Sequence, residues 1–338
     1  MDKITIKDVA LRAGVSVATV SRVINNADTV RPETASRVLA AIKETDYIPN
    51  AAARNLKTAT NPSIGFIVSN ISNSHFTQMA RTIENILRQS NYSLFIASTD
   101  DSPEAERECL RRMVNTNAAG IILNTTGKND DFVSELSAKT PFVLVDRSIS
   151  APEFKGDFVG SNGYGGIQAL VRHLFQYGHR DIAFITSDLS TSTGRERLAG
   201  FADAMQSIGI QADENYIYRY TSGHFNEEGG ADGCRYLMNL PKRPTAIVVG
   251  NNEMAIGVYK YLYHNKISVP GDISVVSYGN ITNSDLFRKE PTIVTLDPTF
   301  IGKKAANLLL SRIAAPELGN RESIFEPLLR INETTCRI

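Results

Sequence analysis

Cysteine, net charge and long apolar runs are scarce or absent in this chain of 338 residues. The three cysteines, Cys109, Cys234 and Cys336, are far apart and follow no paired spacing. This excludes a disulfide framework or a zinc site as an organising element and suits a reducing cytosol. No apolar run reaches the roughly 18 residues of a transmembrane helix, and the N-terminus lacks the apolar core of a signal peptide. We therefore expect a cytoplasmic protein without a membrane span.

The formal charge is zero, so the overall charge indicates no nucleic-acid partner. The first 60 residues, however, carry nine Lys or Arg and six Asp or Glu, whereas the remainder is slightly acidic. A modestly basic N-terminal region suits a DNA-binding protein of limited nonspecific affinity, although so small a difference carries little weight alone. With 42% hydrophobic residues, the chain is long enough for two or three domains.

Residues 6–25, IKDVALRAGVSVATVSRVIN, have the pattern of a helix-turn-helix. Small and apolar residues recur at helical spacing on either side of Gly14, namely Val9, Ala10 and Ala13 before it and Val20 and Val23 after it. Gly14 can adopt the left-handed conformation that such a turn requires. The pattern is typical of a unit whose second helix enters the DNA major groove. A generic helical hairpin is the alternative, but all of these positions would then have to coincide by chance.

Capping and proline signals predict three short helices in this region. Thr5 and Asp8 have the spacing of a capping box, and Ser16 can cap the second helix. Pro32 stands at the first position of a third helix, whose predicted apolar face contains Val38, Leu39 and Ile42. Residues 1–49 are therefore predicted to form an all-α headpiece.

Residues 50–61 are predicted to form a hinge helix followed by a polar linker. Asn50 is a good N-cap, and the three alanines that follow it favour a helix. About eight residues are nevertheless too few for a helix that is stable by itself in water. We expect this segment to be helical only when something packs against it; a plain linker helix is the alternative.

From Ile64 onward, short apolar strands alternate with helical segments. The predicted strands lie at 64–68, 94–97, 120–123, 142–145, around 159, 182–185, 246–249 and 273–276, and the predicted helices include 164–177, 195–208 and 253–265. Fully apolar strands separated by helices are typical of parallel sheets that are covered on both faces. The rhythm restarts near residue 160, so we predict two α/β lobes with a ligand cleft at the carboxyl ends of their strands.

The chain resembles the lactose/galactose repressor family of bacterial transcription regulators over essentially its whole length. The most specific segments are TIKDVALRAGVSVATVSRVIN, YIPNAAARNLK, IGFIVSNISNSHF, RLAGF and NNEMAIGVY. The resemblance implies a homodimer on pseudo-palindromic operator DNA, a hinge helix that folds on that DNA, and an effector domain like the periplasmic sugar-binding proteins. The chain ends without leucine heptads, so we expect a dimer rather than a tetramer.

The resemblance also implies domain boundaries, with three crossovers between the lobes. The headpiece would cover 1–49, the hinge and linker 50–61, and the effector-binding and dimerisation domain 62–338. Lobe one would consist of about 62–160 plus 292–322, and lobe two of about 161–291 plus 323–338.

The second helix of the helix-turn-helix is expected to present its first residues to base edges. Arg22 can bond bidentately to guanine and is the main candidate for base readout, with a solvated surface arginine as the alternative. Val17 and Ala18 have no hydrogen-bonding side chains and can read only shape and thymine methyl groups. The residues expected to position the phosphate backbone are Thr5, Ser16, Thr19, Ser21 and Asn25.

In the hinge, the resemblance places Leu56 where a side chain wedges into the minor groove at the operator centre. Ala53 would keep the paired hinge helices close, and Arg54 and Lys57 would reach phosphates, with Asn50 as the cap. Two inserted leucines would kink the DNA, so we expect a flexible base step at the operator centre.

The resemblance implies a set of effector-binding residues in the cleft: His75, Phe76, Asp146, Arg147, Arg195, Arg197, Phe225, Asn251 and Asp297. Gly279 stands where sugar-binding members carry an aspartate, and Asp297 where a glutamine is usual. The lost carboxylate and the three arginines would make the cleft more positive. A sugar phosphate or sugar acid is therefore one hypothesis for the ligand, a neutral sugar is a second, and a nucleobase or another ligand stays open.

Two other classes of protein fit parts of the sequence. A cytoplasmic or exported sugar-binding protein would explain the lobes but not the helix-turn-helix, and export would need a signal peptide. An enzyme would need a nucleophile–base or metal spacing, which the five histidines do not show, and the segment 160–166 fits neither a dinucleotide fingerprint nor a P-loop. We expect no catalytic residues, metal or cofactor. The sequence thus predicts a DNA-binding regulator, with a sugar-responsive repressor of carbohydrate-utilisation genes as the main hypothesis.

Overall fold

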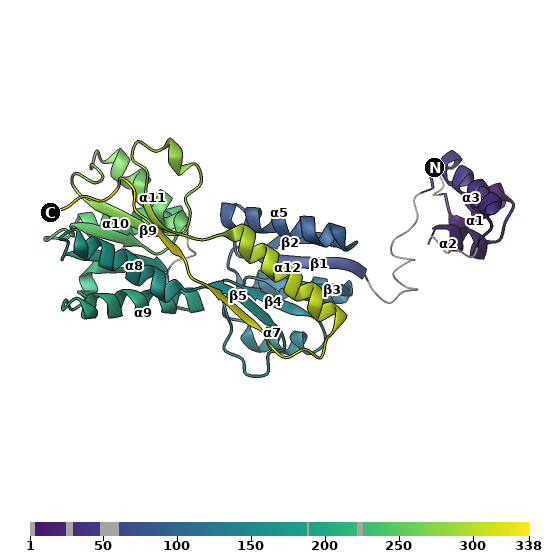
Figure 1. Ribbon diagram of the computed structural model, residues 1–338, viewed down its shortest axis with the longest axis horizontal. Coiled ribbons are helices and arrows are strands. Elements are labelled where there is room, and N and C mark those ends of the chain that lie inside the picture. The colour runs from purple at the N-terminus through teal and green to yellow at the C-terminus, as the bar shows by residue number, and fades with distance from the viewer. Residues whose placement is uncertain (1–3, 25–29, 48–60, 188, 222–225) are drawn as a thin grey trace. The chain divides into compact units, whose positions relative to one another are not determined.

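The computed structural model describes residues 4–24, 30–47, 61–187, 189–221 and 226–338. The chain divides into two compact units, 1–60 and 61–338, and each is considered by itself (Figure 1). Among the described residues, no helix is long and apolar enough to cross a membrane.

The described part of the first unit contains three helices, α1 (Ile6–Ala13), α2 (Val17–Ile24) and α3 (Pro32–Glu44). Gly14 ends α1 with a φ of 64°, the left-handed conformation predicted for the turn. The buried core consists of Val9, Ala10, Ala13, Val20, Val23, Val38 and Ala41. The predicted helix-turn-helix is therefore confirmed.

The prediction for the apolar face of α3 is wrong at one residue, Leu39. Leu39 is 57% exposed, whereas Val38 is fully buried. Successive residues of a helix point about 100° apart, so a face that contains Val38 continues with Ala41 and Ile42 and turns Leu39 outward.

The described part of the second unit contains two six-stranded sheets (Figure 1). In spatial order, the first sheet consists of β11 (Glu322–Phe325), β5 (Asp157–Ser161), β4 (Phe142–Val145), β3 (Ala118–Leu123), β1 (Asn61–Val68) and β2 (Ser93–Ser98). The second consists of β12 (Leu328–Arg330), β10 (Thr292–Thr295), β9 (Ser274–Tyr278), β8 (Ala246–Val249), β6 (Ile182–Ser187) and β7 (Ile217–Tyr220). Adjacent strands are parallel throughout, except that β12 runs antiparallel to β10.

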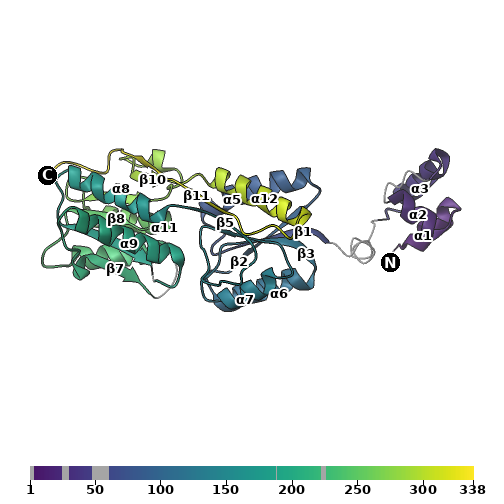
Figure 2. The same cartoon turned by 60° about the horizontal axis from the view of Figure 1, so that its bottom comes forward.

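Helices cover both faces of each sheet. On the first sheet, α5 (Ser74–Gln89) and α12 (Pro298–Ala314) cover one face and α6 (Pro103–Asn115) and α7 (Asp130–Ser137) the other. On the second, α8 (Gly163–Gln176) and α9 (Ser192–Ser207), side by side in Figure 2, cover one face, and α10 (Glu227–Met238) and α11 (Asn252–His264) the other. Two short 3-10 turns, η1 (Glu214–Tyr216) and η2 (Ser284–Leu286), complete the set. Because both faces are covered, every residue of the inner strands β4, β6, β8 and β9 is buried, as the apolar runs predicted. The edge strand β2 is an exception, with Phe95 and Ile96 exposed.

Within the described residues the chain passes between the sheets three times: after β5, after β10 and between β11 and β12. Two boundaries expected from the resemblance need correction. Residues 292–295 belong to the second lobe, because β10 pairs with β9 and β12. The third crossing follows Phe325 rather than residue 322, because β11 pairs with β5 as far as Phe325. The two-lobed α/β fold with parallel sheets is itself confirmed.

Helices α10 and α11 approach so closely that only glycine fits at their contact. A side-chain carbon at Gly257 would lie 1.8 Å from the carbonyl oxygen of Glu227, and one at Gly230 would lie 1.9 Å from that of Met254. The sequence pattern predicts α11 but not α10, because three glycines in residues 227–238 weaken the helical signal. Packing against α11 compensates for that low helical propensity.

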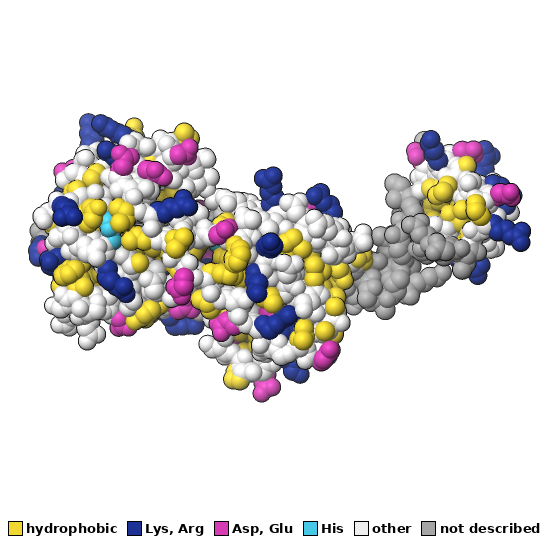
Figure 3. All heavy atoms as spheres, in the orientation of Figure 1, with side chains coloured by type: hydrophobic (Ala, Val, Ile, Leu, Met, Phe, Trp, Pro, Cys, Tyr) yellow, Lys and Arg dark blue, Asp and Glu magenta, His cyan; other side chains and the backbone are white. Residues whose placement is uncertain are grey.

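The face of the molecule in Figure 3 shows acidic and basic side chains interspersed over the second unit, with no broad area of one sign. This agrees with the balanced overall composition of 36 Lys or Arg and 36 Asp or Glu.

Candidate functional site

Helix α2 presents the outer face that the helix-turn-helix pattern predicted. Val20 and Val23 are buried against the other helices, while Val17, Ala18 and Arg22 are exposed. Thr19 and Ser21 are half-buried, and their contact with DNA stays a prediction, as it does for the exposed side chains.

The two predicted helix caps in the headpiece are present. The Asp8 carboxylate accepts from the backbone nitrogen of Thr5 at 2.8 Å and from its hydroxyl at 2.7 Å. The hydroxyl of Ser16 accepts from the backbone nitrogen of Thr19 at 3.2 Å. Thr5 and Ser16 thus hold the starts of α1 and α2, and a phosphate contact would be a second role for each.

Several predicted site residues lie outside the described part of the chain. They are Asn25 at the end of the recognition helix, the hinge residues Asn50, Ala53, Arg54, Leu56 and Lys57, and Phe225 of the expected effector site.

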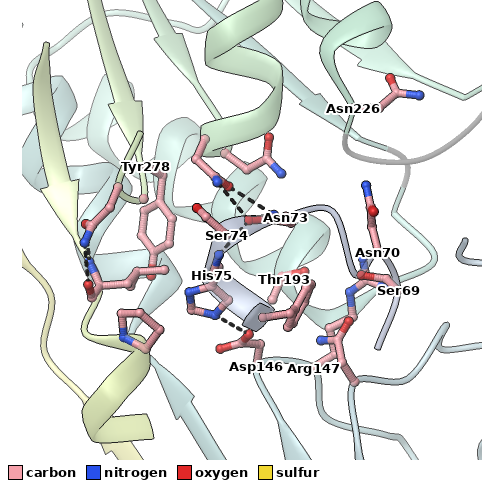
Figure 4. A pocket seen from close by; sticks show the side chains of 18 of the residues that line it. Ser69, Asn70, Asn73, Ser74, His75, Asp146, Arg147, Thr193, Asn226 and Tyr278 are labelled. Carbon is pink, nitrogen blue, oxygen red and sulfur yellow. Dashed lines mark hydrogen bonds and ion pairs between the residues drawn. The ribbon is translucent and has the colours of Figure 1, made fainter. Parts of the chain in front are cut away.

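A cavity of about 240 Å³ lies between the two lobes, at the carboxyl ends of the strands (Figure 4). Six residues predicted for the effector site line it together: His75, Phe76, Asp146, Arg147, Arg197 and Asn251. The structure therefore brings these side chains to one place, as expected for parallel sheets. That they bind a ligand stays a prediction.

Two predicted residues lie elsewhere. Arg195 is exposed and donates to the carbonyl oxygens of Leu189 and Ser190, both at 2.9 Å, instead of lining the cleft. Residues two apart on a helix point about 200° apart, so Arg195 and Arg197 cannot both face the ligand. Asp297 accepts from the backbone nitrogen of Phe300 at 3.0 Å and so caps α12; its neighbour Leu296 lines the cleft instead.

The first-lobe wall of the cleft carries paired charges. His75 Nε2 lies 2.7 Å from Asp146 Oδ2, and Figure 4 shows the two side chains pointing toward each other. Burial would raise the pKa of Asp146, but attraction to His75, with smaller effects of Arg197 and Arg147, lowers it overall. Arg147 forms an ion pair with Asp101 and donates to the carbonyl oxygen of Thr125 at 3.0 Å.

The backbone at this wall is unusual. Asp100, Asp101 and Asp146 all have positive φ, of 48°, 55° and 60°, in the left-handed region that non-glycine residues rarely adopt. Such conformations often occur at functional sites, where the surrounding structure holds them. The strain therefore supports a role for this strand-end region beyond packing.

The second-lobe wall is centred on Arg197. This side chain is only 8% exposed, donates to the carbonyl oxygen of Gly250 at 2.8 Å, and places its guanidinium carbon 4.2 Å from the ring centre of Tyr278. Burial lowers the pKa of Arg197, and attraction to Tyr278 and nearby acids opposes this only in part. Asn251 caps α11 by accepting from Met254 at 2.8 Å.

Direct hydrogen bonds join the lobes across the cleft. Asn73 and Asn252 form a reciprocal amide pair, with nitrogen–oxygen distances of 3.0 and 3.4 Å. The backbone nitrogen of Ser148 donates to the hydroxyl of Ser192 at 3.0 Å. The lobes are therefore in contact around the cavity, and a change in their angle would break these bonds.

Most of the polar lining was not predicted from the sequence. The amide side chains among these residues are Asn70, Asn73, Gln78, Asn124, Asn226, Asn252 and Asn280. Asn124 is 1% exposed and donates to the carbonyl oxygen of Val145 at 3.0 Å, and its own side-chain oxygen meets no donor among the described residues. It directly follows a predicted strand, so a search of all strand ends for amides would have found it.

The helix-turn-helix and the two-lobed domain with its cleft define a class of protein, the DNA-binding regulators that respond to a small ligand. Residues 5–50 match the family model described as bacterial regulatory proteins, lacI family, and residues 171–335 match a periplasmic binding protein-like domain. The chain is 33% identical to the HTH-type transcriptional repressor PurR of Histophilus somni (strain 2336) over 95% of each chain. It belongs to the lacI family of bacterial regulatory proteins and is a transcriptional repressor.

Solved structures support the same assignment. A lac repressor dimer bound to operator and the anti-inducer ONPF has a TM-score of 0.84 and 27% identity, covering 99% of this chain and 100% of that one. The transcriptional regulator CelR in complex with cellobiose has a TM-score of 0.72 and 25% identity, covering 98% and 99%.

Proposed function

We propose that this repressor controls carbohydrate-utilisation genes and that a small sugar or sugar derivative in the interlobe cleft controls the repressor. The observation that carries the proposal is the lining of the cavity, in which the seven amide side chains named above and that of Asn251 accompany hydroxyl and carboxylate groups. An amide can donate to one sugar hydroxyl and accept from another, and a carboxylate can accept from two neighbouring hydroxyls. The complex of the similar regulator CelR with cellobiose supports the same ligand class.

The aromatic groups of the cleft favour a sugar over a nucleobase. The cavity of about 240 Å³ is below the roughly 300 Å³ at which pockets for drug-sized ligands begin, so it suits a small ligand of either class, and the difference lies in its aromatic surface. Among the described residues, the face of Tyr278 is already covered by Arg197, and Phe76 is 7% exposed with the His75 ring against it at 5.3 Å. In the described part of the cleft, a flat base would therefore find little aromatic surface to stack on.

At the DNA end, we propose a homodimer that binds a pseudo-palindromic operator in the cytoplasm. Arg22 on the exposed face of α2 reads a guanine, Val17 and Ala18 read shape, and the polar residues Thr5, Ser16, Thr19, Ser21 and Asn25 position the phosphate backbone. Leu56 wedges into the operator centre, supported by Asn50, Ala53, Arg54 and Lys57. The lac repressor dimer on its operator supports this arrangement. A sugar-binding protein without a regulatory role would leave the helix-turn-helix unexplained.

A thermal-shift screen of the full chain tests the effector proposal. We expect a sugar or sugar derivative to stabilise the protein by about 2.7 kcal/mol at 100 times its dissociation constant, because it binds only the folded state. Nucleobases at the same concentrations serve as the comparison. Stabilisation by a nucleobase alone, with no response to any sugar, sugar phosphate or sugar acid, would contradict the proposal.

A further inference from the structure

The two walls of the cleft differ in charge. Its carboxylates, Asp100, Asp101 and Asp146, all belong to the first lobe. Among the described residues, the second-lobe wall has no carboxylate, and its one charged side chain is Arg197. It consists otherwise of Thr193, Asn226, Asn251, Asn252, Tyr278, Gly279 and Asn280. A ligand that fills the cavity therefore meets acceptors on one side and a buried cation among amides on the other.

The first-lobe wall suits hydrogen-bond donors. The side-chain oxygen of Asn124 is buried and meets no donor among the described residues. Asp100 also lines the cavity, and Asp146 uses one carboxylate oxygen for His75. Arg147 adds no free attraction for an anion here, because it is paired with Asp101. Hydroxyl groups of a ligand satisfy such acceptors, whereas a carboxylate would be repelled.

The second-lobe wall suits one negative charge. Arg197 is more than nine-tenths buried, and burial lowers its pKa, so its charge gains from a further anionic neighbour. Asp146 of the first-lobe wall and Glu196 already attract it, but Asp146 also pairs with His75, and the Glu196 carboxylate lies beside Gly163 of α8 and does not line the cavity. The first turns of α9 and α11, with Thr193 and Asn252, lie on the same wall, where helix dipoles favour negative charge.

Gly279 leaves space next to this wall. A side-chain carbon at Gly279 would meet Asn252 only at ordinary contact distances of 3.6–3.8 Å, so the absent side chain leaves room rather than relieving a clash. An acidic side chain at this position would place a negative charge of the protein next to this wall. Because Gly279 has no side chain, a negatively charged group of the ligand can occupy this space.

We propose that the effector is a sugar acid with one carboxylate, which lies against Arg197 and the space at Gly279, while its hydroxyls donate to Asn124, Asp146 and Asp100. The inference rests on the proposed control by a sugar and names the ligand more narrowly. One arginine matches one carboxylate, whereas a phosphate monoester carries about −1.5 to −2 at pH 7.

Calorimetric titration of the full chain with matched ligands tests the inference. The probes are D-glucose with D-glucuronate and D-gluconate, D-galactose with D-galacturonate, and D-glucosamine and D-glucose 6-phosphate as cationic and dianionic comparisons. We expect one of the acids to bind at least about tenfold more tightly than its neutral parent, because a charge-assisted bond to a buried arginine is stronger than a neutral one.

A pair of variants at Gly279 separates charge from backbone strain. Gly279 has a φ of 95°, so Gly279→Asp and Gly279→Asn introduce the same strain and nearly the same volume. We expect Gly279→Asp to weaken binding of the acid about tenfold more than Gly279→Asn does, and to leave binding of the neutral parent similar in both variants. Arg197→Met is expected to remove the preference for the acid, with circular dichroism and thermal unfolding as checks that it folds.

The outcomes are distinct. A neutral sugar, glucosamine or glucose 6-phosphate that binds more tightly than every acid overturns the sugar-acid inference and leaves control by a sugar derivative intact. Equal effects of Gly279→Asp and Gly279→Asn on a bound acid overturn the placement of its carboxylate. Binding of none of the probes, together with stabilisation by a nucleobase, overturns the proposed function as well.

Discussion

At the scale of the residue, the buried carboxylate of Asp157 in the second unit depends strongly on its charged partners. It is fully buried and accepts from Arg312 at 2.7 and 3.0 Å and from Arg321 at 2.8 and 3.0 Å. These bonds tie β5 to α12 and to the segment that leads into β11. Burial would raise the pKa of Asp157, but the two arginines lower it overall, so the charged form is the stable one.

We expect Asp157→Asn to lower the free energy of unfolding by about 3 kcal/mol, because it leaves two guanidinium groups without their counter-charge. Denaturant unfolding at pH 7 measures the change. Glu108→Gln is the control, since Glu108 pairs with Arg112 on the exposed surface and its loss is expected to cost less than about 1 kcal/mol. If both variants lowered the free energy of unfolding by similar amounts, the buried ion pairs of Asp157 would not be important for stability.

A second prediction at this scale concerns DNA readout. We expect Arg22→Ala to cost about 1–3 kcal/mol of operator binding and to relax the preference at one guanine in each half-site. Selection from random DNA followed by binding measurements checks it. Arg12→Ala removes the same charge from a residue that pairs with Glu44, and should change nonspecific binding only. A uniform loss on all sequences in Arg22→Ala would make Arg22 a phosphate contact.

At the scale of the element, local sequence predicted α1, α2 and α3 but not α10. Helices α1 and α2 carry their own caps and α3 starts at a proline, and those signals lie within a few residues of each helix start. Helix α10 is also capped, because the side chain of Asn226 accepts from the backbone nitrogen of Gly229 at 2.8 Å, but its three glycines lower its helical propensity and its contact with α11 stabilises it. A helix of this kind becomes evident only when its partner is in place.

We expect Gly257→Ala to lower the free energy of unfolding by about 2–3 kcal/mol, because the added carbon would overlap the backbone of α10 and force the helices apart. Gly319→Ala is the matched control, since a carbon there meets nothing within 4 Å. Chemical denaturation of the two variants measures the difference. Equal stability would mean that α10 and α11 can separate without cost.

At the scale of the whole molecule, the C-terminal residues are held to the second lobe by two buried histidines. His173 Nε2 lies 3.0 Å from the hydroxyl of Thr335, and His179 Nε2 donates to the carbonyl oxygen of Cys336 at 3.1 Å. Burial lowers the pKa of both histidines; the nearby His179 lowers that of His173 further, and the bond to Cys336 opposes the shift at His179. The folded protein therefore favours their neutral forms.

A pKa below the ordinary value of about 6.5 means that the unfolded chain binds more protons than the folded one as the pH falls through that value. As the pH falls from 7.5 to 5.5, we expect His173 and His179 to make the free energy of unfolding decrease. The decrease is up to about 1.4 kcal/mol per pH unit for each proton that unfolding takes up. Urea unfolding across this range measures the slope. His179→Gln should make this slope shallower, because it removes one of the two buried histidines. An unchanged slope in His179→Gln would refute the assignment.

The sequence by itself determined the local and the periodic features of this protein. The helix-turn-helix, its caps at Thr5 and Ser16, the apolar strands and the two lobes all follow from signals that span a few residues or one repeat. Such signals suffice because hydrophobic periodicity and capping act through the nearest turns of the chain.

Only the tertiary structure decided which side chains meet. It placed Arg197 in the cleft and Arg195 outside it, made Asp297 a helix cap, and assigned β10 to the second lobe. It also paired Arg147 with Asp101, which neutralises one of the arginines expected to attract an anion. These outcomes depend on contacts between residues far apart in the chain and on the direction in which each side chain points from its helix or strand end. The spacing of residues along the sequence specifies neither of these.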